Sequence, residues 1–98
     1  MALKDQLDAA LEAASRGGDQ VTLSVARVLK GAIKYREIEL GKALDDAGVL
    51  QVVAAEVKRR RDAVEQHRAG NRPDLVEKEE GELAVLQSWL PAQPAVGR

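Results

Sequence analysis

The chain contains no cysteine and no phenylalanine, and its only aromatic side chains are Tyr35 and Trp89. The missing cysteine excludes disulfides and thiol chemistry and is typical of an intracellular protein. With so few aromatic residues, the core of this 98-residue chain must be built from Leu, Val, Ile and Ala. These residues, together with abundant Lys, Arg, Glu and Gln, favour helices over sheets.

A strong net charge and a long apolar run are also missing. The formal net charge is -1, so the whole chain has no strong attraction to nucleic acid or anionic lipid. The N-terminus is charged from Lys4 onward, unlike a signal peptide. No apolar run approaches the length that spans a membrane. We therefore expect a cytoplasmic protein without a membrane partner.

Apolar residues recur at helical spacing in four segments, and no stretch alternates as a strand does. The pattern predicts helices over Leu3–Ser15, Gln20–Leu40, Asp45 or Asp46 to Ala69, and Asp74–Leu90. Glycine or proline follows each segment, as is common at helix ends. The expected fold is all-α, a compact bundle of about four helices joined by short turns.

Four charged side chains interrupt the apolar faces of these helices: Arg36, Glu39, Arg60 and Glu79. On the second helix, Glu39 projects to the face shared by Val21, Val25, Val28, Leu29, Ala32 and Tyr35, which we expect to be the core face. A charge on an apolar face is costly unless it is paired. The sequence therefore predicts an ion-pair cluster that fixes helix register, with His67 nearby; the alternative is a polar pocket for a ligand. Arg60 should pair with Glu39 or, as second choice, with Glu79, because its fork suits carboxylate oxygens.

Basic side chains form two clusters, one expected on the outer face of the second helix and one in the third. Their members are Arg27, Lys30 and Lys34, then Lys58, Arg59 and Arg61. Such point charges suit sequence-independent contact with RNA phosphates, whereas the alternative is an ordinary solvated surface. No aromatic residue interleaves with them, so base stacking is not expected. A continuous basic patch would favour RNA, and interruption by acidic groups would favour a protein partner.

Residues that could carry catalysis are scarce. His67 is the single histidine, and the serines have no visible base partner. No Asp, Glu and His spacing resembles a metal site. We therefore predict no catalytic residue, no metal site and no cofactor.

Five stretches together carry a resemblance to a known family. They are Leu23–Lys30 (LSVARVLK), Glu37–Gly41 (EIELG), Glu56–Asp62 (EVKRRRD), Asp74–Glu79 (DLVEKE) and Trp89–Pro91 (WLP). Over residues 1–93 the chain resembles the N-terminal domain of the GatB/YqeY family. This family usually continues into a second, smaller helical domain. We therefore expect residues 1–91 to form the N-terminal domain and residues 92–98 a tail or linker stub, with the second domain absent.

The resemblance implies a link to translation. YqeY proteins are similar to the C-terminal region of GatB, a subunit of the glutamine-dependent Asp-tRNA/Glu-tRNA amidotransferase. That region is helical and helps to hold tRNA, while the chemistry resides elsewhere. The implied function is a non-catalytic helical binding module, with tRNA or a tRNA-associated protein as partner. The alternatives are a protein-interaction module without RNA and an accessory part of a carbon–nitrogen ligase that uses glutamine as amido donor.

Overall fold

The computed structural model describes residues 2–89, which form four helices and no strand. They are α1 (Leu3–Gly17), α2 (Gln20–Leu40), α3 (Asp46–Ala69) and α4 (Pro73–Ser88). The predicted all-α fold of four helices is confirmed. The bounds of α2 and α3 are as predicted, while α1 runs to Gly17 and α4 begins at Pro73. The predicted end of the last helix at Leu90 and the predicted tail, residues 92–98, lie outside the described residues.

Short side chains and glycine set the ends of the long helices. The Asp19 carboxylate accepts a hydrogen bond from the backbone N–H of Thr22 at the start of α2, at 3.1 Å. Asp45 does the same for Gly48 at the start of α3, at 2.9 Å. These bonds satisfy N–H groups that have no partner within the helix. Gly41 ends α2 at a φ of 71°, a left-handed conformation that glycine adopts without strain.

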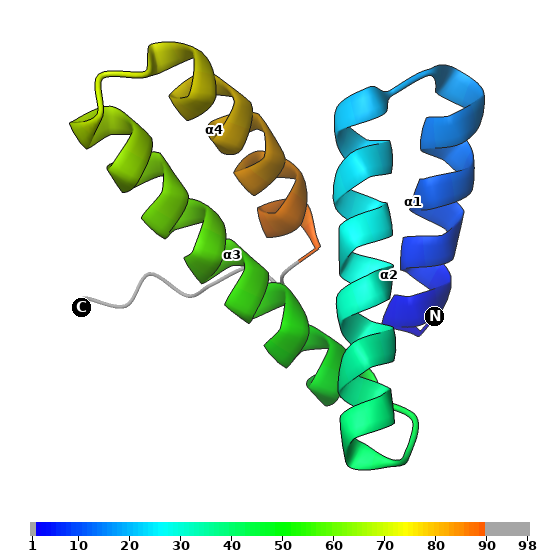
Figure 1. Cartoon of the computed structure of the whole chain (residues 1–98). Helices are drawn as coiled ribbons and strands as arrows, with labels where there is room; N and C mark the ends of the chain where they lie inside the picture. The colour runs from blue at the N-terminus through cyan, green and yellow to red at the C-terminus, as the bar shows by residue number, and fades with distance from the viewer. Residues whose placement is uncertain (1, 90–98) are drawn as a thin grey trace, which may run out of the picture.

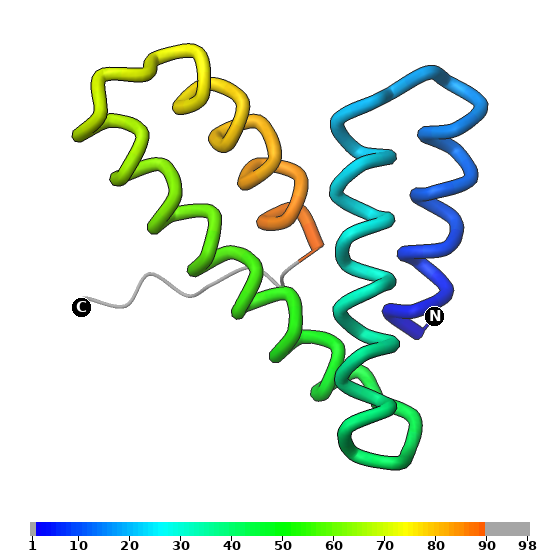
Figure 2. The backbone as a smooth tube through the Cα atoms, in the orientation of Figure 1, coloured from blue at the N-terminus to red at the C-terminus, as the bar shows by residue number. Residues whose placement is uncertain are grey.

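The helices form two antiparallel pairs, α1 with α2 and α3 with α4 (Figure 1). The pairs meet near the end of α2 and the start of α3 and diverge toward the opposite end, as the backbone trace makes clear (Figure 2). α2 and α3 each contact all three other helices, and α2 packs against α1 on one side and against α4 and α3 on the other (Figure 1). This arrangement places the core along one side of α2.

The core is aliphatic, as the composition requires. Its buried members are Leu7, Val25, Ala26, Leu29, Ile33, Val49, Val53, Val57 and Leu86. Leu29 of α2 and Leu86 of α4 are the largest of the fully buried side chains, and both belong to this core. Burial of a side chain of this size contributes about 1.5–3 kcal/mol relative to exposure.

The core face of α2 overlaps only in part with the predicted one, because Val25 and Leu29 are buried as expected and three other members are not. Val21, Val28 and Tyr35, expected to be inside, are 46%, 45% and 66% exposed. The buried face is centred on Leu29 and includes Val25 and Ile33. The prediction was wrong for Val21, Val28 and Tyr35 because the apolar residues of α2 cover more than one side, so periodicity alone does not show on which side the other helices pack.

Candidate functional site

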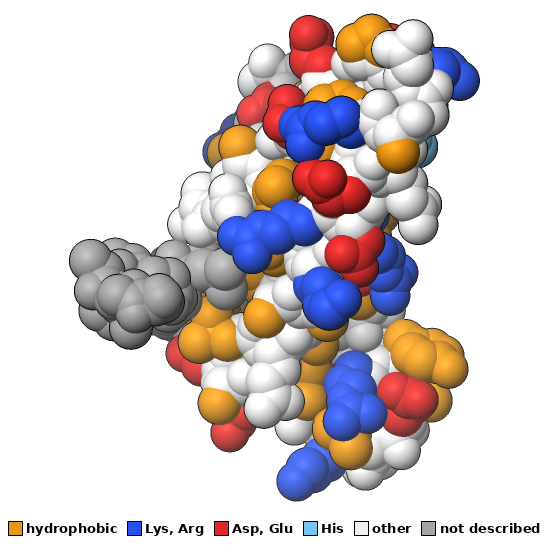
Figure 3. All heavy atoms as spheres, turned by 90° about the vertical axis from the view of Figure 1, so that its left-hand side faces the viewer, with side chains coloured by type: hydrophobic (Ala, Val, Ile, Leu, Met, Phe, Trp, Pro, Cys, Tyr) orange, Lys and Arg blue, Asp and Glu red, His pale blue; other side chains and the backbone are white. Residues whose placement is uncertain are grey.

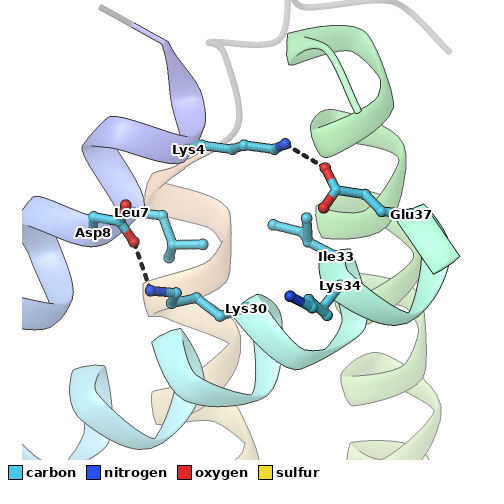
Figure 4. A pocket seen from close by; sticks show the side chains of 7 residues that line it. All are labelled: Lys4, Leu7, Asp8, Lys30, Ile33, Lys34 and Glu37. Atoms are coloured by element: carbon cyan, nitrogen blue, oxygen red, sulfur yellow. Dashed lines mark hydrogen bonds and ion pairs between the residues drawn. The ribbon is translucent and has the colours of Figure 1, made fainter. Parts of the chain in front are cut away.

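A pocket of about 170 Å³ lies between α1 and α2. Buried Leu7 and Ile33 form its apolar floor, and charged side chains from both helices surround it (Figure 4). The charged residues are Lys4, Asp8, Lys30, Lys34 and Glu37. Two of the basic residues that the sequence singled out, Lys30 and Lys34, therefore face the edge of α1.

Acidic side chains neutralise much of this pocket. Lys30 Nζ lies 2.8 Å from Asp8 Oδ1, and Lys4 forms an ion pair with Glu37. Glu37 also accepts a hydrogen bond of 2.7 Å from the backbone N–H of Leu44, so it ties α1 to the loop after α2. The bond from Lys4, and then that from Leu44, hold the pKa of Glu37 below its ordinary value.

Arg27 and Lys34 differ from Lys30. Neither forms an ion pair with any described residue, and Figure 4 accordingly draws no contact from Lys34. Arg27 lies one turn before Lys30 on the same side of α2. It lines a surface hollow together with Asp8 and Glu12 of α1. Lys34 nevertheless shares the pocket with Glu37 and helps to lower the pKa of that carboxyl. Among the described residues, Arg27 and Lys34 thus have no ion pair, whereas Lys30 between them is neutralised by Asp8.

The basic run of α3 is also interrupted. Lys58 Nζ lies 3.2 Å from Asp62 Oδ2, and an Arg59 nitrogen lies 3.6 Å from Glu56 Oε2. Arg61 forms no ion pair within the described part of the chain. On the side of the molecule where α3 and α4 lie, basic and acidic side chains alternate (Figure 3). No continuous basic patch results on this face of residues 2–89.

Arg60 lies among three carboxylates that join α3 to α4. Its Nε is 3.3 Å from Glu82 Oε1 and 3.7 Å from Glu79 Oε1, and its Nη2 is 3.9 Å from Glu56 Oε1. The side chain of Arg60 is 17% exposed and that of Glu56 only 5%. His67 Nε2 lies 3.7 Å from the second oxygen of Glu79. The structure thus brings Arg60 and Glu79 together, with His67 at the edge of the cluster.

Glu39 and Arg36 do not belong to this cluster. They lie on the exposed side of α2, where Arg36 Nη1 is 3.4 Å from Glu39 Oε1. The predicted pairing of Arg60 with Glu39 is therefore wrong. Periodicity did not show which side of α2 is buried, and Glu39 lies on an exposed side. Two members were missed, Glu56 and Glu82. Their spacings gave a signal, since Glu56 is four residues before Arg60 on one helix and Glu82 three after Glu79 on another.

Negative charge exceeds positive charge inside the Arg60 cluster. Burial and then the neighbouring Glu79 carboxylate raise the pKa of Glu82 above its ordinary value. Glu56 Oε1, Arg60 Nε and Glu79 Oε1 are buried and make no hydrogen bond in the described structure. Because the side chains are only 5–17% exposed, the cluster has little room for a ligand and acts mainly as a link between α3 and α4.

An apolar surface on α2 is the feature that sequence reasoning missed. Val21, Val28, Tyr35 and Ile38 are exposed, Ile38 by 69%. They lie on one side of the helix together with Ser24 and Gly31, which are also exposed. We call these six residues the α2 stripe. The sequence did contain a sign of this surface, because the apolar residues of α2 cover a wider arc of the helix than one buried face can include.

The residues described contain no group of three or more His, Cys, Asp or Glu side chains that could hold a metal ion. Within the same range, no helix is both long and apolar enough to cross a membrane.

Comparison with known proteins gives a family and several relatives. A family profile described as "Yqey-like protein" matches residues 4–96. The chain is 32% identical over 77 residues to "Altered inheritance of mitochondria protein 41, mitochondrial" of Lachancea thermotolerans, covering 78% of the chain and 41% of that protein. The protein of the same name in Saccharomyces cerevisiae is 30% identical, with 78% and 42% covered. An uncharacterised protein of Schizosaccharomyces pombe is 35% identical over 68 residues, with 69% and 55% covered. The chain thus spans about two fifths of the length of the mitochondrial relatives.

Proposed function

Since the chain belongs to the YqeY-like protein family, we propose that it is a non-catalytic helical binding module whose ligand is another protein. The observation that carries this proposal is the α2 stripe, where four large apolar side chains are 45–69% exposed. A contiguous apolar surface of this kind on a small domain is typical of an interaction site. The stripe follows α2 along a side that is not buried, and at its start Val21 and Ser24 line a hollow together with Asp74, Glu77 and Glu82 of α4.

The distribution of charge favours a protein over RNA. Asp8, Asp62 and Glu56 each stand beside a cation that was a candidate for phosphate contact. A phosphate would have to compete with these carboxylates, and the net charge of -1 adds no long-range attraction. The sequence analysis took a continuous basic patch as favouring RNA and a patch interrupted by acidic groups as favouring a protein. The interruption of the basic surface by carboxylates therefore supports a protein partner.

Site-specific photo-cross-linking tests the proposal. A photoreactive phenylalanine analogue replaces Tyr35 in the stripe, and in a control chain it replaces Glu12, an exposed residue of α1. Both chains are expressed in the source organism and irradiated. We expect adducts at position 35 that protease removes and ribonuclease does not, and none at position 12. Absence of adducts at position 35, or adducts removed by ribonuclease, would count against a protein ligand.

Binding of tRNA is the second candidate, favoured by Arg27, Lys34 and Arg61, which have no ion-pair partner among the described residues, and by the relation of the family to GatB. Affinity for bulk tRNA is measured over a range of salt concentrations. Removal of one cation that binds a phosphate should lower the slope of log K against log salt by about one. Replacing Arg27, Lys30 and Lys34 by Ala should therefore lower the slope by about two, because Lys30 is already paired with Asp8. An unchanged affinity and slope would remove this surface from consideration.

The family resemblance suggests a carbon–nitrogen ligase, but we do not propose this activity for the chain. No nucleophile with an adjacent base stands out in the sequence, so we expect no glutamine hydrolysis or amide transfer by the isolated chain. Turnover that disappears when a residue of this chain is mutated would contradict this. A cytoplasmic location stays a prediction, since the mitochondrial location in the relatives' names is a property of those proteins.

A further inference from the structure

The α2 stripe repeats every seven residues. Val21, Val28 and Tyr35 are seven apart, and so are Ser24, Gly31 and Ile38, each three residues after a member of the first set. This is the spacing of the two seam positions of a helix that packs along another helix at a shallow angle. The stripe is therefore suited to a helical partner rather than to a flat or globular surface.

The middle of the stripe has room for close approach. A side chain at Gly31 would meet nothing within 4 Å, so the space over this glycine is open. Val28 and Tyr35, three residues before it and four after it, are exposed on the same side of the helix. A large side chain of a partner helix fits there, as a knob fits between neighbouring seam residues.

The charged residues along the α1 side of the α2 stripe indicate which kind of partner helix would fit. Arg27 and Lys34 each precede a stripe residue, Val28 and Tyr35, and lie on the side of the stripe toward α1. Neither forms an ion pair with a described residue. Two such cations seven residues apart beside an apolar seam complement carboxylates at the same spacing.

We propose that the α2 stripe docks an amphipathic helix of a partner protein whose apolar seam is bordered by acidic residues on the side that faces Arg27 and Lys34. This inference rests on the proposed protein-binding function and adds the chemistry of the partner. The apolar seam supplies affinity, and the acidic border supplies orientation and preference among helices.

Synthetic peptides test the partner chemistry directly. One helical peptide of three heptads has Leu at both seam positions and Glu at the flanking positions on one side of the seam, and its matched control has Lys in place of each Glu. Binding to the full chain is measured by fluorescence anisotropy. The Glu peptide should bind about ten-fold more tightly than the Lys peptide. The double change Arg27→Ala and Lys34→Ala should reduce that preference, whereas Arg61→Ala on α3 should leave it unchanged.

Gly31→Gln separates docking from folding. Glutamine has a better helix propensity than glycine and would project into open space, so the variant should fold at least as stably as the natural chain. It should nevertheless weaken binding of the Glu peptide about ten-fold, because its side chain occupies the open space over position 31. Ala54→Gln, at an exposed position of α3, is the matched control and should have no effect on binding.

Three results would overturn the inference. They are equal binding of the two peptides, unchanged binding by Gly31→Gln, and a dimer of the chain alone that Gly31→Gln converts to monomer. The last would identify a second copy as the occupant. If the peptides fail while position 35 still cross-links to a protein, the helix inference is wrong and the proposed protein-binding function stands.

Discussion

Removal of Arg60 should be among the most destabilising single changes in this protein. The guanidinium lies 3.3–3.9 Å from the carboxylates of Glu56, Glu79 and Glu82. Arg60→Ala would leave these three carboxylates close together, with Arg59, His67 and Lys78 as nearby cations among residues 2–89. Removing one partner of a buried pair typically costs 3–5 kcal/mol. Since the side chains retain some exposure and can bind protons, the low end applies, about 3 kcal/mol.

Urea unfolding at neutral pH measures this cost, with two variants as controls. Arg59→Ala removes an arginine that is 71% exposed and next to the same cluster, and should cost less than about 1 kcal/mol. Arg60→Met keeps the aliphatic stem and removes the charge, so it separates the effect of packing from the effect of charge. Equal costs for Arg59→Ala and Arg60→Ala would refute the reasoning.

The pH dependence of the Arg60→Ala cost provides a second check. Without Arg60, the clustered carboxylates repel one another more strongly and their pKa values in the folded protein rise. Protonation at acidic pH then relieves the repulsion. The difference in unfolding free energy between Arg60→Ala and the natural chain should shrink as pH falls toward about 4. A difference that stays constant with pH would indicate weaker packing instead.

Three further predictions concern single positions. The raised pKa of Glu82 means that the folded chain binds the proton of this carboxyl more tightly than the unfolded chain does, so the contribution of Glu82 to stability falls as pH rises above 4.5. In the Glu82→Gln variant, the melting temperature should therefore depend less on pH above that value. The contribution of Glu37 to stability depends on pH in the opposite way, because it is present above pH 4.5 and disappears as pH falls through the lowered pKa. Glu37→Gln should therefore lower the melting temperature at pH 7 and have little effect in acid. Gly41→Ala should cost about 1 kcal/mol in urea unfolding because its φ is 71°, whereas Ala at Gly31, a helical position with open space around it, should be neutral or stabilising.

Local chemistry explains why the helices were predictable. Each depends on interactions within a few residues, such as the Asp19 cap of α2 and the glycine that ends it, and these are visible in the sequence. The apolar face of α3 was predictable too, because Val49, Val53 and Val64 belong to a narrow apolar set on an otherwise polar helix. In such a helix the apolar face and the buried face have to coincide.

The faces of α2 were not predictable in the same way. Its apolar residues cover two sides, and only the packing of α1, α3 and α4 decides that Leu29 is inside and Tyr35 outside. The same ambiguity misplaced Glu39. The Arg60–Glu79 contact was among the expected pairs because both residues interrupt narrow apolar faces. The surplus of carboxylate around Arg60 depends on the alignment of α3 with α4, which periodicity does not fix.

The central claim is that the α2 stripe is a protein-binding surface. Titration of the isotope-labelled chain, followed by amide NMR shifts, tests it most directly, with the Glu peptide and bulk tRNA added to separate samples. We expect the Glu peptide to shift the amide signals of residues 21–38 and to leave those of α3 in place, and we expect tRNA to produce weaker shifts that vanish with salt. Shifts by the peptide confined to α3 or α4, or a salt-resistant tRNA footprint across α2, would contradict it.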